Sequence, residues 1–345
     1  MISVGIVACG KIAQVRHLPE YADRPDVRIA GLYDLNAARA SSLAERYGAK
    51  VYESAEALFA DPAIDAVSVC SSNDTHAALA LAALRAGKHV LLEKPMAMNA
   101  ADCEELAATA RACGRLLMID QNQRLAAAHV KARALIEKGA IGRPVTFATS
   151  FRHGGPETWS VDPGAGTWFF DRKKAVMGAM ADLGIHKTDL IQYLLGQTIV
   201  EVSAKLSTLD KRYADGTLIG VDDNAICIYT MDGGAVGTMT ASWTDYGPED
   251  NSTVIYGTEG VLRIYCDPDH TLILEKKDGT REFIEADRIQ TNDEQTKSGV
   301  IDLFVDCILD PAREGIPASS VLTAMRAVFA AVESSETGRA VRVNR

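Results

Sequence analysis

The sequence predicts an α/β protein of two domains, the first with a parallel sheet between helices and the second with an open, mainly antiparallel sheet. Two observations carry this prediction. Residues 2 to about 120 alternate short apolar runs with longer helical stretches. After residue 120, several strands follow one another through hairpin turns. A chain of 345 residues has the usual length for two domains, which we place at residues 1–121 and 122–345.

In the first domain, strands and helices are expected to alternate. A strand at 3–8 leads into a helix at 11–22, and a strand at 27–33 leads into a helix at 36–47 that begins at Asn36, a favourable N-cap residue. Apolar runs at 66–70, 89–92 and 115–119 are separated by helical segments at 75–86 and 100–112. Strands that are connected through helices lie parallel, with helices on both faces of the sheet.

The second domain is expected to begin with a helix at 126–138, an extended run at 145–152, a polar loop at 154–166 and a helix at 178–195. Strands are then predicted at 200–209, 224–231, 235–243, 252–256, 261–266, 271–275 and 281–284. Asp232-Gly233-Gly234 and Asp278-Gly279 are typical hairpin turns. Helices near 295–309 and 319–336 complete an open sheet with helices on one face.

Composition excludes several functional classes. The net charge is −10 and no basic cluster exceeds Arg172-Lys173-Lys174, which argues against a nucleic-acid partner. Seven scattered cysteines without a Cys-x-x-Cys pair are typical of the reducing cytoplasm. The histidines lack His-x-x-x-His spacing, so we expect no metal site. The first nine residues have no basic segment and their apolar run is short, so neither a signal peptide nor a membrane partner is expected.

The first strand runs into Ala8-Cys9-Gly10-Lys11-Ile12-Ala13, a variant of the Gly-x-Gly-x-x-Gly/Ala turn that opens a Rossmann fold. Small residues let the backbone approach a pyrophosphate, and the following helix supplies amide groups. Only the middle position is glycine here, so we expect Ala8 to adopt a conformation open to alanine, because a positive φ would cost about 1 kcal/mol. The alternative is an ordinary strand-to-helix turn.

Asp34 lies at the end of the second strand, 24 residues after Gly10. A carboxylate at this place binds the ribose hydroxyls of NAD and repels the 2′-phosphate of NADP. The following Leu35 and Asn36 offer no basic partner to such a phosphate, so NAD is the predicted cofactor. The alternative is an acidic residue that merely flanks a helix.

Longer motifs support this prediction. Asn73-Asp74-Thr75-His76 is followed by Ala86-Gly87-Lys88-His89-Val90-Leu91-Leu92-Glu93-Lys94-Pro95, and downstream come the segments 135–142 and Asp182-Leu183-Gly184-Ile185-His186. In this order the motifs resemble those of the glucose–fructose oxidoreductase / inositol dehydrogenase / MocA family. The resemblance runs from residue 3 to about 196 and is weaker beyond.

The resemblance implies a Rossmann domain, a second α/β domain whose sheet mediates homo-oligomers (dimers or tetramers), and activity on sugars, inositols or related polyols. It implies that Lys94, Asp182 and His186 are catalytic, and that Asn73, His76, Glu93 and Asn122 line the cofactor together with Lys94. The turn residues Ala8, Gly10, Lys11 and Ile12, the acidic Asp34, and Ser71 and Ser72 after the third apolar run complete the predicted cofactor site. Three positions depart from the family pattern: Ala8 replaces a glycine, Ser71-Ser72 replaces Thr-Pro, and residues 177–181 replace a glycine-rich segment.

Oxidation of an alcohol needs a base for the hydroxyl proton while hydride leaves carbon. Histidine suits this role near neutral pH, so His186 is the expected base, with Asp182 one helical turn away as its orienting group and Asp189 as an alternative. Lys94 would place a cation beside the developing alkoxide. A cis bond between Lys94 and Pro95 is a further hypothesis.

The loop 151–171 contains polar and aromatic side chains suited to sugar hydroxyls and ring faces, and the alternative is a surface loop or an oligomer contact. The predicted substrate-binding residues are Lys94, Arg124, Arg152, Trp168, Asp182 and His186. Two other functions remain open: an enzyme that retains NAD and transiently oxidises a sugar for elimination, glycoside cleavage or epimerisation, and a non-catalytic NAD-binding protein.

Overall fold

The computed structural model describes residues 1–288 and 297–343. These residues divide into two compact units. The first contains Met1–Asp120, Trp159–Val161 and the described part of Gln295–Leu322. The second contains Gln121–Thr158, the described part of Asp162–Glu294, and Thr323 to the end of the described chain.

The first unit is built on a six-stranded parallel sheet in the order β3-β2-β1-β4-β5-β6, which is the Rossmann order. The strands are β1 (Ile2–Val7), β2 (Val27–Tyr33), β3 (Lys50–Val51), β4 (Ala66–Val69), β5 (His89–Leu92) and β6 (Leu117–Ile119). The connecting helices are η1 (Ala13–His17), α1 (Leu18–Ala22), α2 (Ala37–Tyr47), α3 (Ala55–Ala60), α4 (Asn73–Arg85) and α5 (Ala100–Cys113). The predicted fold class is therefore confirmed for this part.

Local sequence signals account for most of these elements. The strands β1, β4, β5 and β6 are buried almost throughout, as continuous apolar runs of a two-sided sheet should be. Asn36 caps α2 as predicted, since its side chain accepts a hydrogen bond from Arg39 N–H at 3.1 Å. The short β3 and α3 were not predicted, because two exposed strand residues give no periodic pattern. The first predicted helix is interrupted by the π-helical η1.

The second unit is built on a nine-stranded sheet in the order β14-β13-β12-β11-β7-β10-β9-β8-β15. Its strands are β7 (Pro144–Arg152), β8 (Ile199–Ser207), β9 (Asn224–Met231), β10 (Val236–Ser242), β11 (Thr253–Gly257), β12 (Gly260–Ile264), β13 (Leu272–Lys276), β14 (Arg281–Ile284) and β15 (Val341–Arg342). All pairs are antiparallel except the central β7–β10 pair. The prediction of a mainly antiparallel sheet is confirmed.

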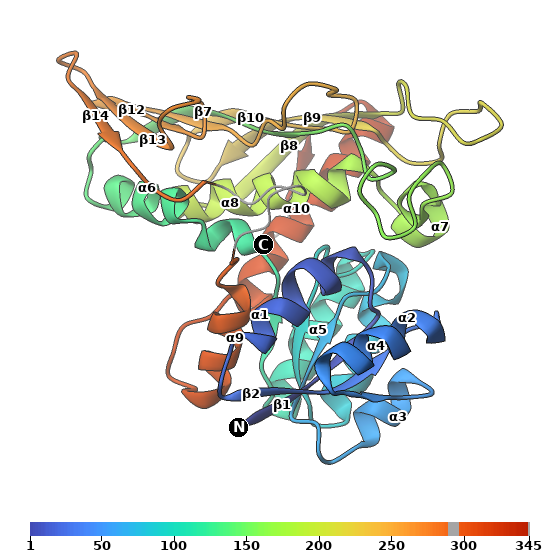
Figure 1. Ribbon diagram of the computed structural model, residues 1–345. Helices are drawn as coiled ribbons and strands as arrows, with labels where there is room; N and C mark the ends of the chain where they lie inside the picture. The colour runs from blue at the N-terminus through green and yellow to red at the C-terminus, as the bar shows by residue number, and fades with distance from the viewer. Residues whose placement is uncertain (289–296, 344–345) are drawn as a thin grey trace. The chain divides into compact units, whose positions relative to one another are not determined.

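Helices cover one face of this sheet (Figure 1). They include α6 (Ala127–Glu137), α8 (Ile185–Leu195) and the end of α10 (Ala318–Thr337), where Ser334 and Ser335 accept hydrogen bonds from Ala204 and Leu206 N–H of β8. Short segments η2 (Asn122–Leu125), η3 (Trp168–Phe170), α7 (Arg172–Ala175) and η4 (Met180–Gly184) connect the longer elements. On the opposite face, alternate residues of the central strands are exposed.

The chain returns to the first unit near its end, which the predicted ranges 1–121 and 122–345 do not include. The helix α9 (Val300–Leu309) packs against α1, and Ile119 N–H donates to Ile316 O at 3.3 Å. Glu20 accepts hydrogen bonds from Ser298 N–H and Oγ–H at 2.8 and 2.9 Å. The predicted start of this helix near 295 lies outside the described residues. Such long-range contacts leave no local pattern in the sequence.

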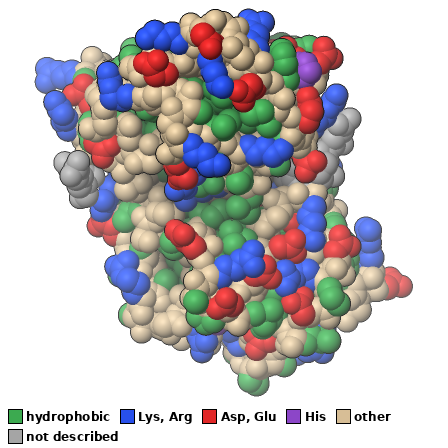
Figure 2. All heavy atoms as spheres, turned by 90° about the vertical axis from the view of Figure 1, so that its left-hand side faces the viewer, with side chains coloured by type: hydrophobic (Ala, Val, Ile, Leu, Met, Phe, Trp, Pro, Cys, Tyr) green, Lys and Arg blue, Asp and Glu red, His purple; other side chains and the backbone are tan. Residues whose placement is uncertain are grey.

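Within the described chain, no helix has the length and apolar character that crossing a membrane requires. On the face drawn in Figure 2, basic and acidic side chains are interspersed rather than gathered into a basic area.

Candidate dinucleotide and catalytic site

The parallel pairing of β1, β2, β4, β5 and β6 brings the residues that follow these strands to one edge of the sheet. This edge carries most of the predicted cofactor residues: the turn at 8–12, Asp34, Ser71–Ser72 and Glu93–Lys94. Ligands of open α/β sheets bind outside the carboxyl ends of the strands, where the strand order reverses. In this sheet the reversal falls between β1 and β4.

The turn after β1 corrects one expectation. Ala8 has φ 68°, in the left-handed region, although alanine was expected to avoid it. Its N–H is held by Tyr33 O at 2.8 Å, so the path between β1 and β2 imposes the conformation despite the Cβ. At Gly10 an added Cβ would meet no atom within 4 Å, so the space above this residue is open for a ligand. The turn therefore keeps its shape although its first glycine is missing.

Ala8→Gly is expected to stabilise the protein by about 0.5–1 kcal/mol, because glycine adopts a positive φ without strain but loses more chain entropy on folding. Urea unfolding of the isolated variant and wild type measures the difference. Gly48→Ala, which introduces a Cβ at the left-handed C-cap of α2, is the matched control and should destabilise. Equal or lower stability of Ala8→Gly would contradict strain at Ala8.

Asp34 follows β2 and contacts the turn after β1. Its carboxylate accepts hydrogen bonds from Cys9 N–H and Asn36 N–H, both at 2.6 Å, and so ties the end of β2 to the turn after β1. Arg39 lies 3.7 Å from the same carboxylate, a basic neighbour that the residues directly after Asp34 did not reveal. It comes from the first turn of α2, where helical periodicity brings residue 39 back over residue 36.

The segment after β4 forms the start of α4. Ser72 occupies the N-cap position, Ser71 Oγ accepts a hydrogen bond from the hydroxyl of Thr75 at 2.7 Å, and Asn73 is buried at the first helical turn. His76 is buried between two backbone carbonyls, Pro95 O at 2.8 Å from Nδ1 and Ser71 O at 3.0 Å from Nε2. Burial lowers the pKa of His76, so a neutral ring donates to one carbonyl. His76 thus braces the loops after β4 and β5.

Glu93 and Lys94 follow β5 directly. Glu93 is buried and accepts a hydrogen bond from Lys94 N–H at 3.2 Å, whereas Lys94 is partly exposed at the same edge of the sheet as Asp34 and the turn. The bond between Lys94 and Pro95 is cis, as hypothesised. Glu93 is thus directed inward, whereas Lys94 lies at the partly exposed edge of the sheet.

In the second unit, Asp182 lies in the π-helical segment η4 and His186 at the start of α8. Both side chains are buried, each 7% exposed. Asp182 Oδ2 accepts a hydrogen bond from the indole N–H of Trp243 at 3.1 Å, a contact that no sequence spacing indicated. π-Helical turns are rare and often occur at functional sites. The catalytic role of Asp182 and His186 stays a prediction.

The backbone before η4 is anchored by Asp222. Its carboxylate accepts hydrogen bonds from Gly178 N–H at 2.7 Å and Met180 N–H at 2.8 Å. An added Cβ at Gly178 would clash with the backbone oxygen of Asp222, so this position requires glycine. These contacts fix the start of the segment that carries Asp182, although the family's glycine-rich sequence is absent.

The surroundings of His186 differ from one expectation. Asp189, considered as an alternative orienting group, is instead bound by Arg124, whose Nε and Nη2 donate to its two oxygens at 2.7 and 2.5 Å. The ring of His186 packs 6.0 Å from Phe151, which in turn contacts His153. Asn122 begins η2, the segment that also carries Arg124.

Several polar residues of the loop 151–171 stabilise the loop itself. His153 Nδ1 accepts from Gly155 N–H at 3.0 Å, Glu157 pairs with Lys211, and Asp171 caps α7 by accepting from Lys173 N–H at 2.9 Å. Two residues in and beside this loop, Arg152 and Trp168, were predicted to bind substrate. Arg152 is exposed with Nε 3.7 Å from Asp245, and Trp168 stacks on Phe169 with ring centroids 4.0 Å apart.

Lys187, next to His186, is a buried cation that the sequence did not single out. It is fully buried and donates to Asn251 O at 2.9 Å. Burial lowers the pKa of Lys187 to about 7, while Asp250, Cys266 and Glu249 oppose this shift.

Lys187→Met is therefore expected to raise the free energy of unfolding by about 1–3 kcal/mol at pH 6, because the buried charge costs more than the lost hydrogen bond contributes. An unfolded lysine titrates near 10.4, so the wild type carries the full penalty below pH 7 and loses it as the pH rises toward about 10. The advantage of the variant should shrink over this window. Urea unfolding across pH 6–10 measures it, and a difference independent of pH would contradict the prediction. Lys205→Met, at an exposed position of β8, should show no such dependence.

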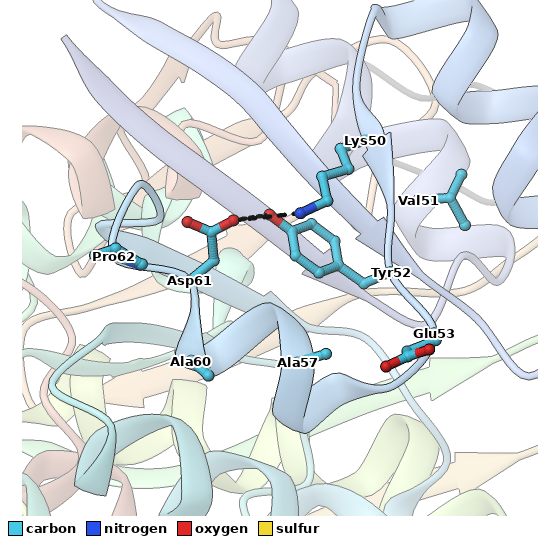
Figure 3. A pocket seen from close by; sticks show the side chains of 8 residues that line it. All are labelled: Lys50, Val51, Tyr52, Glu53, Ala57, Ala60, Asp61 and Pro62. Carbon is cyan, nitrogen blue, oxygen red and sulfur yellow. Dashed lines mark hydrogen bonds and ion pairs between the residues drawn. The ribbon is translucent and has the colours of Figure 1, made fainter.

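A separate surface pocket lies beside β3 and α3 (Figure 3). Three of its polar side chains meet: Tyr52 donates to Asp61 at 2.6 Å, and Lys50 lies 3.5 Å from the same carboxylate. None of the predicted cofactor or substrate residues lines this pocket. Lys50, Tyr52 and Asp61 already bind one another, so we assign the pocket no function.

The first unit fits a dinucleotide at the edge of its sheet. The open space at Gly10, the turn ahead of η1 and the Asp34 carboxylate supply the features that bind pyrophosphate and adenosine ribose. Together with a lysine after β5 and an Asp-x-x-x-His segment, they define the class of dinucleotide-dependent oxidoreductases.

Comparisons with known proteins agree with this class. Residues 2–121 match the model described as "Oxidoreductase family, NAD-binding Rossmann fold", and residues 129–263 match the GFO/IDH/MocA C-terminal domain. The chain belongs to the Gfo/Idh/MocA family of NAD-binding oxidoreductases.

Similar proteins cover most of the chain. A myo-inositol 2-dehydrogenase of Thermotoga maritima is 27% identical over 81% of this chain and 79% of its own. A dTDP-3,4-didehydro-2,6-dideoxy-alpha-D-glucose 3-reductase of Streptomyces violaceoruber is 30% identical over 82% of this chain and 80% of its own. The crystal structure of an aldose-aldose oxidoreductase from Caulobacter crescentus, complexed with glycerol, is 26% identical, with a TM-score of 0.83 over 99% of both chains. The predicted family and NAD cofactor are thereby confirmed.

Proposed function

We propose that this enzyme transfers hydride between NAD and a secondary alcohol of a sugar, an inositol or a related polyol. The observation that carries the proposal is the position of Lys94, at the same sheet edge as the dinucleotide turn and Asp34. The similar dehydrogenase and reductase named above act on an inositol and on a sugar nucleotide, which supports this substrate class.

In the proposed mechanism, the His186 imidazole accepts the hydroxyl proton and the Lys94 ammonium stabilises the developing alkoxide. Asp182, held by Trp243, orients the imidazole. NAD supplies the hydride acceptor when bound. The residues proposed to hold it are those of the turn (Ala8, Gly10, Lys11, Ile12), Asp34, Ser71, Ser72, Asn73, His76, Glu93, Lys94 and Asn122. Arg124, Arg152 and Trp168 are proposed to contact the substrate.

A spectrophotometric assay with a panel of polyols tests the proposal. When myo-inositol, D-glucose or levoglucosan is added to enzyme and excess NAD, the absorbance of NADH at 340 nm should increase steadily for at least one compound. A substrate that is consumed or isomerised without accumulation of NADH would instead support the retained-NAD alternative. Tight NAD binding without turnover of any panel member would favour a non-catalytic protein.

We also propose that the enzyme forms a homo-oligomer, a dimer or tetramer, through the exposed face of the nine-stranded sheet. The register places exposed side chains of neighbouring strands side by side: Ile228 pairs with Thr238, and Thr146 with Val236 and Tyr256. Ile226, Ile228, Val236 and Tyr256 are 38–57% exposed, so this face is apolar at its centre. An apolar sheet face of this kind is typical of a subunit interface.

Ile228→Lys should therefore convert the oligomer into monomers, because a charge at the centre of an apolar interface is costly to bury. Light scattering coupled to size-exclusion chromatography measures the change. Leu209→Lys, at an exposed position after β8, is the matched control and should leave the mass unchanged. A wild type that is monomeric at micromolar concentration would exclude this interface.

The enzyme is further proposed to be cytoplasmic. The seven cysteines are scattered along the sequence without a Cys-x-x-Cys pair, which supports a reducing compartment.

A further inference from the structure

A buried group of charged side chains lies behind Lys94 in the first unit. His17, at the end of η1, places Nε2 3.0 Å from Glu93 Oε1 and 3.5 Å from Asp120 Oδ2. Arg16 Nη1 lies 3.5 Å from the same Asp120 oxygen. His17 and Asp120 are 0% exposed, Glu93 5% and Arg16 8%. The group therefore joins the helix after β1 to the carboxyl ends of β5 and β6, away from water.

The charges in this group balance when His17 is protonated, with two cations facing two carboxylates. Burial alone would lower the pKa of His17, but the neighbouring Cys70, Asp120 and Glu93 raise it well above its usual value. Burial would likewise raise the pKa of Asp120, but Arg16 and His17 hold it well below the usual range. The other titratable groups that face this cluster are Cys70 after β4 and Tyr21 and Glu20 on α1.

The same three side chains, His17, Glu93 and Asp120, present ligand atoms within 4.8 Å of one another, a spacing that a metal ion could use. The proximity of Arg16 argues against a cation at this place, because the guanidinium already neutralises Asp120. Each carboxylate has a protein cation nearby: His17 lies 3.0 Å from Glu93, and Arg16 and His17 each lie 3.5 Å from Asp120. The cluster is therefore explained as a network of ion pairs.

Glu93 connects this network to the proposed catalytic lysine. One of its oxygens, Oε1, is held by His17, and the other, Oε2, accepts the backbone N–H of Lys94 at 3.2 Å. The helix that carries His17 also contacts the dinucleotide turn, since Gln14 Nε2 donates to Cys9 O at 2.8 Å. A substitution of His17 would therefore affect the backbone of Lys94 through one group, the Glu93 carboxylate.

We infer that His17 is a positioning residue of this enzyme: its ring fixes the Glu93 carboxylate, which in turn fixes the backbone from which Lys94 reaches the reacting hydroxyl. The inference rests on the proposed role of Lys94 in turnover. It assigns to a buried histidine of the first helix an effect on kcat rather than on NAD binding. The imidazole does not touch the substrate.

The first experiment measures the Lys94 backbone directly. Hydrogen–deuterium exchange of the peptide containing Lys94 is compared in the wild type, His17→Leu and His17→Gln. In His17→Leu, the Lys94 amide should exchange about 10-fold faster, because Glu93 loses its donor and becomes mobile. His17→Gln retains an N–H donor and should restore protection to within about 3-fold of the wild type. Unchanged exchange in His17→Leu would overturn the inference.

His89 provides the matched control because it lies at the amino end of the same strand β5 and accepts a hydrogen bond from Leu116 N–H at 3.1 Å. His89→Leu should leave Lys94 exchange at the wild-type value. Equal acceleration in His17→Leu and His89→Leu would show general loosening of the sheet and would refute a specific role of His17.

The second experiment is a double-mutant cycle on turnover with the panel compound that gives the highest rate. His17→Leu alone should lower kcat about 10–100-fold and change the Kd of NAD by less than about 3-fold. In the Lys94→Ala background, His17→Leu should lower kcat by less than about 3-fold, because the group that it positions is gone. Fully additive losses would contradict action through Lys94.

The third readout covers the case in which His17→Leu does not fold. A raised pKa means that the stabilising charge of His17 is present below about pH 6.5 and is lost as the pH rises through the folded-state value. The wild type should lose unfolding free energy across this alkaline window, and His17→Gln should not. Identical pH profiles would refute the charged network.

These outcomes separate the inference from the proposed function. Lys94→Ala with unchanged kcat would remove the lysine from the reaction, whatever His17 does. A large loss in Lys94→Ala together with normal kcat and Lys94 exchange in His17→Leu would leave the proposed function intact and refute the inference alone. If no panel compound reacts, the exchange experiment still decides whether His17 fixes the Lys94 backbone.

Discussion

His186→Gln should lower kcat about 10²–10⁴-fold, the range that general-base catalysis contributes. Glutamine retains hydrogen-bonding capacity and similar size but cannot accept the hydroxyl proton at neutral pH. Steady-state formation of NADH with the best panel substrate measures the loss. NAD affinity, followed by quenching of protein fluorescence, should change by less than about 3-fold, since binding does not require the base.

His129→Gln is the matched control for this variant. His129 is likewise a buried histidine of the second unit, where Nδ1 lies 2.7 Å from Gln123 O, but it has no proposed catalytic role. Its replacement should lower the free energy of unfolding but have little effect on kcat. A kcat of His186→Gln comparable to that of the wild type would exclude His186 as the base.

Lys94→Ala should lower kcat about 100-fold or more, because the alkoxide would then develop without a neighbouring cation. The binding of NAD should remain largely intact, since the turn and Asp34 hold the other parts of the cofactor. Stopped-flow measurement of the first turnover separates chemistry from NADH release. The deficit should appear in the first turnover itself.

Lys50→Ala controls for the loss of a lysine from the same unit. Lys50 lies on the edge strand β3, beside Tyr52 and Asp61 (Figure 3). Its side chain is 63% exposed. Its removal should leave kcat unchanged. An unchanged kcat in Lys94→Ala as well would remove Lys94 from the mechanism and leave its position at the sheet edge without a catalytic explanation.

The sequence predicted the fold class because its signals are local. A strand buried on both faces must be apolar throughout, and a helix of the doubly wound layer must alternate apolar and polar residues at its own period. The strands β2, β9 and β14 were predicted with the bounds that the structure shows. The short β3 and α3 were not predicted, because their few residues form no pattern long enough to be distinguished from a loop.

The conformation of Ala8 shows where local reasoning fails. Intrinsic preference disfavours a positive φ for alanine by about 1–2 kcal/mol, and from the sequence we expected the turn to respect it. The structure holds Ala8 at φ 68° because its N–H is bound by the neighbouring strand and its turn must reach Asp34. Contacts made across the sheet outweigh the preference of one residue.

By itself, the sequence determined the two sheets, the dinucleotide turn with Asp34, and the residues expected to react, Lys94, Asp182 and His186. Only the tertiary structure decided which partners bind the acidic residues of these segments. Trp243 binds Asp182, Arg124 binds Asp189, and His17 binds Glu93. The physical reason is the range of the interactions. Periodicity and turn chemistry act between neighbours in the chain, whereas a buried polar group takes its partner from whichever segment the fold brings beside it.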